Sequence, residues 1–169
     1  MPDWQARVTK ERSHDLRAGE QVIAATYFQG RGSAVGQIMF GAVTGIVGGA
    51  IANRIALDQR NAHLDRSREG FHRPEGSVAA AVPDDKGILA ITDQRLIVFA
   101  YKQGVFSTKI LDTLVDIPLE HLVGWSYTPK KVASVLNLAF DDGSDTGIEL
   151  PMANKPDRFA DALGIPRAG

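Results

Sequence analysis

The stretch from Gly30 to Leu57 limits most strongly what this chain can fold into. It reads GRGSAVGQIMFGAVTGIVGGAIANRIAL and carries no charged residue between Arg31 and Arg54. Residues 34–52 have about the length of a helix that crosses a hydrocarbon core, which takes roughly 20 residues. The stretch therefore needs a membrane, a second helix or a protein surface to cover it.

Three glycines indicate close helix packing in this stretch. Gly41, Gly45 and Gly49 recur every four residues, so on a helix they share one face. Small residues at this spacing let a second backbone approach closely in membranes, whereas in water each glycine within a helix costs about 0.5–1 kcal/mol relative to alanine. We predict an apolar helical insert over residues 30–57, with these glycines as its helix-packing residues. A bend at Gly48 would make the insert a helical hairpin.

The composition excludes several classes of function. The 169 residues include 19 basic and 20 acidic side chains, and the net charge of −1 argues against a nucleic-acid partner. There is no cysteine, so disulfides, thiolate metal sites and cysteine nucleophiles are absent. None of the four histidines stands at the i, i+4 spacing of a helical zinc pair. We predict no metal, no cofactor and no catalytic residue, and therefore a protein that is not an enzyme.

The remainder of the chain predicts antiparallel strands. Residues 1–18 are expected to form a short helix or a frayed arm, and Gln21–Gln29 a first strand. Apolar runs separated by turn residues predict six more strands: Gly87–Thr92, Arg95–Tyr101, Lys109–Ile117, Leu122–Thr128, Ser134–Phe140 and Thr146–Leu150.

Two segments complete the predicted organisation. Residues 58–85 are rich in charge and include Pro74 and Gly76, so we expect a charged linker that is mostly exposed. After the last strand, Asn154 is expected to cap a final helix that has Pro156 in its first turn and ends at Gly164.

Four short motifs follow one another in an order found in a known family. They are Gly19-Glu20 before the first strand, Thr92-x-x-Arg95-Leu96 between two strands, Ile117-Pro118-Leu119, and Phe140-x-Asp142-Gly143. This order resembles the bacterial PH-like domains (pleckstrin-homology and GRAM type) and covers residues 19–29 and 86–165. The glycine-rich insert departs from the family pattern.

The resemblance implies a fold and a role for one turn. The fold is α+β, a PH-like antiparallel barrel or sandwich capped by a C-terminal helix, with the apolar insert after the first strand. The turn from Thr92 to Arg95 serves the fold rather than catalysis in that family, and we expect Asp93 to bond its own backbone there.

The resemblance also implies a binding role. PH-like domains bind lipid headgroups or protein segments, and the fold alone does not choose between them. Basic residues near the open end of such barrels contact phosphates, which makes Lys102, Lys109, Lys130 and Lys131 candidates for binding lipid or a protein partner. We predict a non-enzymatic module that associates with membranes or forms a homo-oligomer through its insert. The polar N-terminus lacks a secretion signal, so we expect a cytoplasmic protein at the inner face of the membrane.

Two alternatives remain open at this point. Gly30, Gly32 and Gly36 follow a predicted strand and precede the apolar stretch, close to a dinucleotide fingerprint but with one residue too many before the last glycine. That pattern would make the chain a small nucleotide-binding enzyme, although the parallel strand that such a site needs is not predicted. The second alternative is a structural oligomer without a ligand.

Overall fold

The computed structural model describes residues 3–30, 70–103 and 108–165. Most of the glycines predicted to pack the insert or bind a nucleotide lie outside these residues: Gly32, Gly36, Gly41, Gly45 and Gly49. Gly30 is described.

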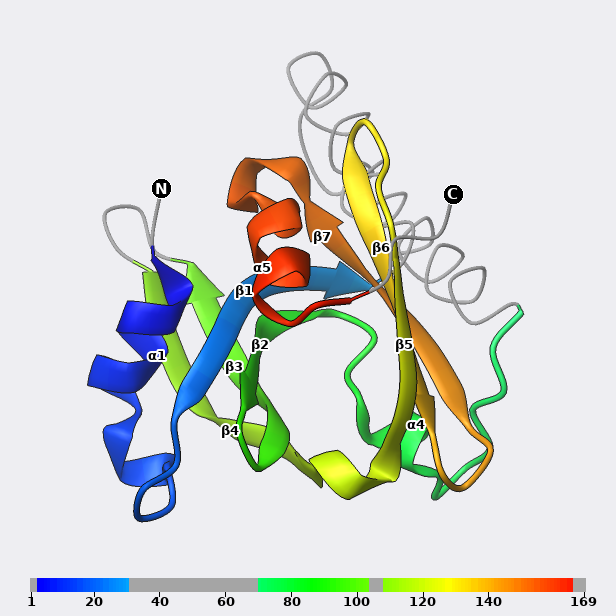
Figure 1. Cartoon of the computed structure of the whole chain (residues 1–169), viewed down its shortest axis with the longest axis horizontal. Helices are drawn as coiled ribbons and strands as arrows, with labels where there is room; N and C mark the ends of the chain where they lie inside the picture. The colour runs from blue at the N-terminus through cyan, green and yellow to red at the C-terminus, as the bar shows by residue number, and fades with distance from the viewer. Residues whose placement is uncertain (1–2, 31–69, 104–107, 166–169) are drawn as a thin grey trace, which may run out of the picture.

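Seven strands form one antiparallel sheet in the order β4-β3-β2-β1-β7-β6-β5 (Figure 1). Their bounds are β1 Val22–Gly30, β2 Lys86–Thr92, β3 Arg95–Gln103, β4 Thr108–Pro118, β5 Leu122–Thr128, β6 Ala133–Phe140 and β7 Asp145–Pro151. All seven predicted strands are present. Among the described residues, β4 and β5 have no strand on their outer edges, so the sheet does not close into a barrel.

The described helices are short. They are α1 Trp4–Glu11, the 3-10 turn η1 Ser13–Asp15, α4 Val78–Ala81, η2 Leu119–His121, η3 Met152–Asn154 and α5 Pro156–Ala162. None of the helices in this part of the chain has the length and apolar character needed to cross a bilayer.

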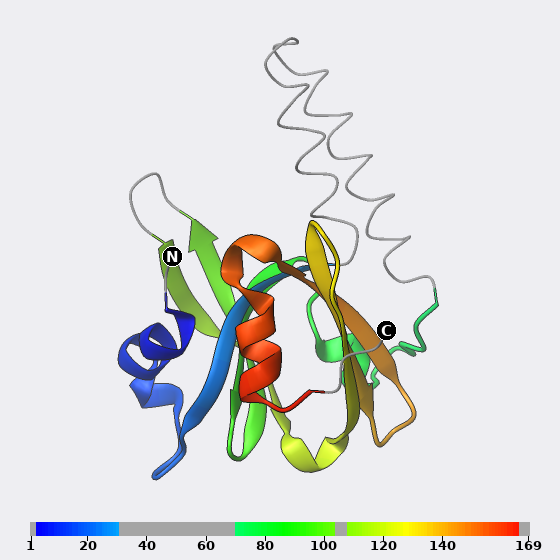
Figure 2. The ribbon, with the colours of Figure 1, turned by 45° about the horizontal axis from the view of Figure 1, so that its top comes forward.

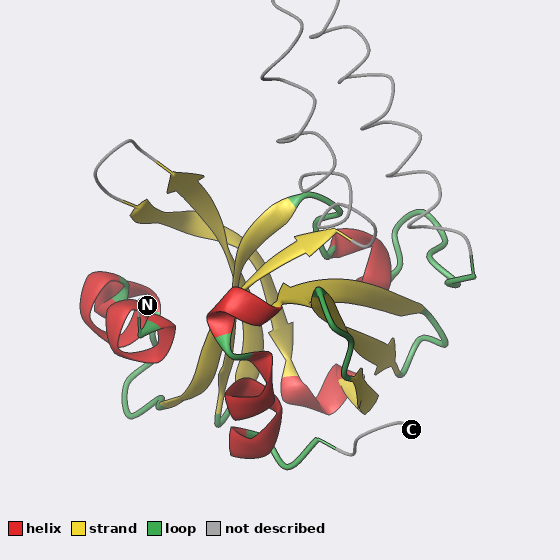
Figure 3. Ribbon diagram, turned by 90° about the horizontal axis from the view of Figure 1, so that it is seen from above, coloured by secondary structure: helices red, strands yellow, loops and turns green. Residues whose placement is uncertain are grey.

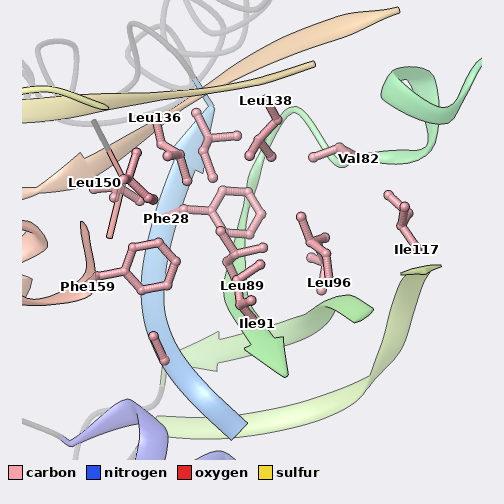
Figure 4. Packing of buried hydrophobic residues seen from close by; sticks show 14 of the residues in the cluster. Phe28, Val82, Leu89, Ile91, Leu96, Ile117, Leu136, Leu138, Leu150 and Phe159 are labelled. Atoms are coloured by element: carbon pink, nitrogen blue, oxygen red, sulfur yellow. The ribbon is translucent and has the colours of Figure 1, made fainter. Parts of the chain in front are cut away.

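The concave face of the sheet encloses the main core. Leu89 and Leu96 from β2 and β3 pack in one cluster with Leu136 and Leu150 from β6 and β7. Phe159 of α5 joins this cluster, which Figure 4 shows from close by. The C-terminal helix α5 therefore covers the apolar interior between the two halves of the sheet (Figure 2).

The convex face carries a second core beneath α1. Trp4 and Val8 of this helix are buried against Ile88, Ile97 and Phe99 of the sheet. Alternate residues of β2 thus serve both cores, since side chains in a strand point alternately to its two faces. The N-terminal residues form the predicted short helix, and that helix is part of the fold (Figure 3).

The segment from residue 70 to residue 85 exposes half of its residues, as expected of a linker, but it is also anchored to the domain by buried contacts. Ala79 in α4 is fully buried. The ring of Phe71 lies so close to Gly147 in β7 that a Cβ there would be 2.5 Å from the ring. An Arg73–Asp84 ion pair also fixes the segment. The charges that suggested solvent exposure thus sit beside apolar anchors.

Two local predictions are also corrected. Asn154 lies in η3 and does not cap α5, whose capping residue is Lys155 with a left-handed backbone. The Asn154 amide instead accepts a hydrogen bond from the Trp4 indole at 3.2 Å. In the β2–β3 turn, the Thr92 hydroxyl accepts the turn's N–H groups, while the Asp93 carboxylate accepts from the distant Gln21.

Candidate functional site

The four candidate lysines lie in two hairpins and do not form one cluster. Lys102 and Lys109 are directly opposite each other in the β3–β4 pair. Lys130 and Lys131 lie in the turn between β5 and β6. All four side chains are exposed, and none makes an ion pair with another residue in the described ranges.

The β5–β6 turn belongs to a larger feature, which we call the basic tip. It comprises Lys130, Lys131 and Val132 from the turn, with Met152 and Lys155 from the segment after β7. Val132 and Met152 are exposed apolar side chains, at 44% and 39%. The two segments involved, 128–133 and 151–155, contain no acidic residue. Positive charge and exposed apolar surface therefore coincide here, although the whole chain is slightly acidic.

Strand pairing brings the two segments of the basic tip together. Ala133 pairs with Pro151 where β6 and β7 meet, and the Met152 N–H donates to the Val132 carbonyl at 3.2 Å. Figure 2 shows the β5–β6 hairpin, in yellow, ending beside the orange turn after β7. Residues 20 positions apart in the sequence thus share one surface.

A buried polar cluster supports the basic tip from below. The Ser134 hydroxyl, which is fully buried, accepts a hydrogen bond from the Lys130 N–H at 3.4 Å. The Tyr127 hydroxyl lies 2.9 Å from it and 2.6 Å from the Asp157 carboxylate of α5. This cluster links β5, β6 and α5, and therefore holds the tip against the body of the domain.

The strongest perturbation of an ionisable group lies elsewhere and is structural. The Glu20 carboxylate accepts two hydrogen bonds from the Arg95 guanidinium, at 2.8 and 2.9 Å. These bonds are the main cause that lowers the pKa of Glu20 to about 2. Arg95 also contacts Asp116 and the Asp15 carbonyl, so it ties the segment before β1 to the sheet. The prediction that the Thr92–Arg95 turn serves the fold agrees with these contacts.

His121 and Asp141 form an exposed pair, with Nδ1 and Oδ2 2.8 Å apart. This hydrogen bond raises the pKa of His121 above its usual value of 6.5. Asp142, next along the turn, accepts hydrogen bonds from Ser144 and from the Val78 N–H, which starts α4. These carboxylates therefore serve the β6–β7 turn.

Gly30 stands in a setting different from a nucleotide-binding loop. It is the last residue of β1, pairs with Ile148 in an antiparallel ladder, and donates its N–H to the Asp85 carbonyl. A Cβ at Gly30 would lie 1.7 Å from the Asp84 carbonyl oxygen, so close packing of the chain accounts for the glycine. In the described residues, no three His, Asp or Glu side chains are placed to hold a metal ion.

Three parts of the basic tip were not predicted from the sequence: Val132, Met152 and Lys155. Val132 directly follows the two lysines, and this basic–apolar triplet is a signal that could have identified it. Met152 and Lys155 have no local signal, because only the pairing of β6 with β7 brings them there.

No family model, curated protein sequence or solved structure matches the chain.

Proposed function

We propose that this chain is a non-enzymatic, PH-like binding module that docks on anionic membrane surfaces through its basic tip. The observation that carries the proposal is the adjacency of three lysines and two exposed apolar side chains on two paired segments that contain no acidic residue. Seven antiparallel strands followed by a single covering helix support the PH-like assignment.

The physics of a lipid surface suits this arrangement. A lysine near an anionic leaflet contributes about 1 kcal/mol, and an apolar side chain beside it can enter the boundary between headgroups and acyl chains. Val132 and Met152 are positioned for that contact, since both stand out from the fold on the same side as Lys130 and Lys131.

Lys102 and Lys109 are the weaker candidates. Like charges directly opposite each other in a sheet repel, so their pairing favours an anionic partner of some kind. Their immediate neighbours in the two strands are polar, half-buried or buried, and Leu111, two residues from Lys109 in β4, is exposed at 37%. We assign them an auxiliary electrostatic role.

The glycine-rich insert completes the proposal. Gly41, Gly45 and Gly49 would provide a face for close packing, either with a second copy of the chain or within the membrane that the basic tip approaches. Replacement of Gly45 by leucine tests this part. We expect the variant to lose oligomer mass or vesicle binding, and unchanged values for both would remove the packing role.

Flotation with vesicles tests the basic tip. We expect the wild-type chain to float with vesicles that contain anionic lipid, and Lys130→Gln with Lys131→Gln to bind about 30-fold more weakly, from about 1 kcal/mol for each lysine. The matched control is Lys102→Gln with Lys109→Gln, which removes the same charge and is expected to bind more tightly than the tip variant. Equal binding by the two double variants would remove the specific role of the tip.

A further inference from the structure

A groove lies between α1 and α5 and has Lys155 in common with the basic tip. β1 forms its floor through Ala24 and Ala25, whose small side chains leave room, and Trp4 and Phe159 contribute walls. Figure 1 shows β1, in blue, running between the two helices. The groove measures about 300 Å³, at the lower end of the roughly 300–1,000 Å³ typical of ligand sites. It therefore suits a small molecule better than a nucleotide cofactor.

The groove exists because β1 is only partly paired. Along its whole length β1 pairs with β2, whereas β7 pairs only with Gln29 and Gly30 at its end. In the described structure, the earlier part of β1 has no strand on its second edge, and the two helices flank it instead. Gln5 of α1 donates its amide to the Val22 carbonyl at 2.8 Å, which fixes one wall.

Opposite charges face this groove from its two sides. Asp3 comes from the start of α1, while Lys155 and Arg158 come from the start of α5. None of the ion pairs in the described residues joins Asp3 to either cation, and neither cation pairs with another carboxylate. The charges are thus held apart on opposite walls, with net charge +1.

The backbone at Lys155 gives a second, independent indication of a site. Its φ and ψ of 49° and 59° are left-handed, and it is the one described residue other than glycine with a positive φ. Glycine or asparagine would adopt this conformation more readily than lysine. Strained residues of this kind cluster where a ligand is held, and here the strained residue supplies a cation to the groove.

We propose that the groove binds a small zwitterionic ligand that carries a phosphate ester and an ammonium group, as phosphoethanolamine does. The phosphate takes the Lys155 and Arg158 side, where two cations match a phosphate monoester with two negative charges. The ammonium takes the Asp3 side. The charge of such a ligand, −1, complements the net +1 of the groove, which shares Lys155 with the basic tip but adds Asp3 and Arg158.

Nuclear magnetic resonance on the intact chain tests this proposal, because Trp4 reports on the groove. Its indole N–H donates to the Asn154 amide oxygen, while the other tryptophan, Trp125, lies outside the groove and is an internal control. We expect O-phosphoethanolamine to shift the Trp4 indole signal with saturation and to leave that of Trp125 unchanged. Inorganic phosphate and glycerol 3-phosphate, which lack the ammonium, are expected to bind about tenfold more weakly.

Three variants sharpen the test. Asp3→Asn keeps a good helix cap and should abolish the preference for O-phosphoethanolamine over glycerol 3-phosphate. Lys155→Gly and Arg158→Gln should each weaken binding about tenfold, and Lys10→Gln, an exposed lysine of α1 outside the groove, should not. Equal affinities for the three probes, equal shifts of both tryptophans, or no shift would overturn the proposal.

A phosphatidylethanolamine headgroup presents the same pair of phosphate and ammonium groups, as a diester with one negative charge fewer than the free ester, and a vesicle arm separates the two sources. Vesicles of phosphatidylethanolamine mixed with phosphatidylcholine have no net charge, so the basic tip alone does not drive their binding. Flotation with these vesicles, lost in Asp3→Asn, would identify the headgroup as the ligand. Binding of only soluble O-phosphoethanolamine would identify a free metabolite of this class, and binding of neither would contradict the site.

Discussion

Replacement of Glu20 by glutamine should remove much of the stability that links the segment before β1 to the sheet. The Glu20 side chain is fully buried and bonded to Arg95 and Thr92. Its pKa falls from 4.5 to about 2, and at roughly 1.4 kcal/mol per pKa unit this corresponds to about 3 kcal/mol of folding free energy. Loss of one partner from a buried ion pair costs a similar amount, roughly 3–5 kcal/mol.

The pH dependence of this effect follows from the direction of the shift. A carboxylate whose pKa is lowered by folding stabilises the native state fully above its unfolded pKa, and this stabilisation is lost as pH falls from 4.5 towards 2. The difference in unfolding free energy between wild type and Glu20→Gln should therefore be about 3 kcal/mol at pH 7 and shrink steadily over that window.

Urea unfolding followed by tryptophan fluorescence at pH 7, 4 and 2.5 measures this difference. The control is Glu11→Gln, which removes a partly exposed carboxylate paired with Arg7 within α1 and should cost less than about 0.5 kcal/mol. A Glu20→Gln variant within 1 kcal/mol of wild type at pH 7, or a difference that does not shrink with acid, would refute the reasoning.

Three further predictions concern single positions. Lys155→Gly should stabilise the fold by about 0.5–1 kcal/mol in thermal unfolding. Removal of a left-handed lysine gains roughly 1–2 kcal/mol, and the greater flexibility of glycine in the unfolded chain offsets roughly 0.5–1 kcal/mol of this gain. An unchanged or lower melting temperature would contradict this prediction. Gly30→Ala should destabilise the fold by about 1–3 kcal/mol, because the new Cβ would lie 1.7 Å from a carbonyl oxygen. In the control Gly124→Ala the nearest atom is 3.9 Å from the new Cβ, so the free energy of unfolding should change by less than about 0.5 kcal/mol. Proton NMR should show His121 titrating above 6.5, because its hydrogen bond to Asp141 stabilises the protonated ring. The Asp141→Asn variant should lower the pKa of His121, and identical titration midpoints in the two proteins would exclude the pair in solution.

Most of the sheet could be predicted because its signals are local. The alternation of apolar and polar residues in β6 and the Asp-Gly turn after it depend only on residues close in the sequence. The same holds for the two apolar runs of β2 and β3. The packing of α1 had a weaker signal, since Trp4 and Val8, four residues apart, are its main apolar anchors. The segment between α1 and β1 is tied to the sheet by the contact between Glu20 and Arg95, which is 75 residues away in the sequence.

The candidate site could be predicted only in part for the same reason. Lys130 and Lys131 are adjacent in the sequence and could be identified as candidates. Their apolar partner Met152 joins them through the β6–β7 ladder, and the groove depends on where α1 and α5 settle beside an incompletely paired strand. Such features arise from contacts between distant residues, for which one sequence carries no local pattern.

Site-specific labelling tests the central claim, membrane docking through the basic tip, most directly. The chain has no cysteine, so Val132→Cys can carry a single environment-sensitive fluorophore at the tip. Val123→Cys is the control, because Val123 is also exposed, at 63%, but lies near the other end of β5. We expect anionic vesicles to shift the emission of the label at position 132 to the blue and to leave that at position 123 unchanged. A shift at position 123 alone, equal shifts at both positions, or no shift at either would contradict it.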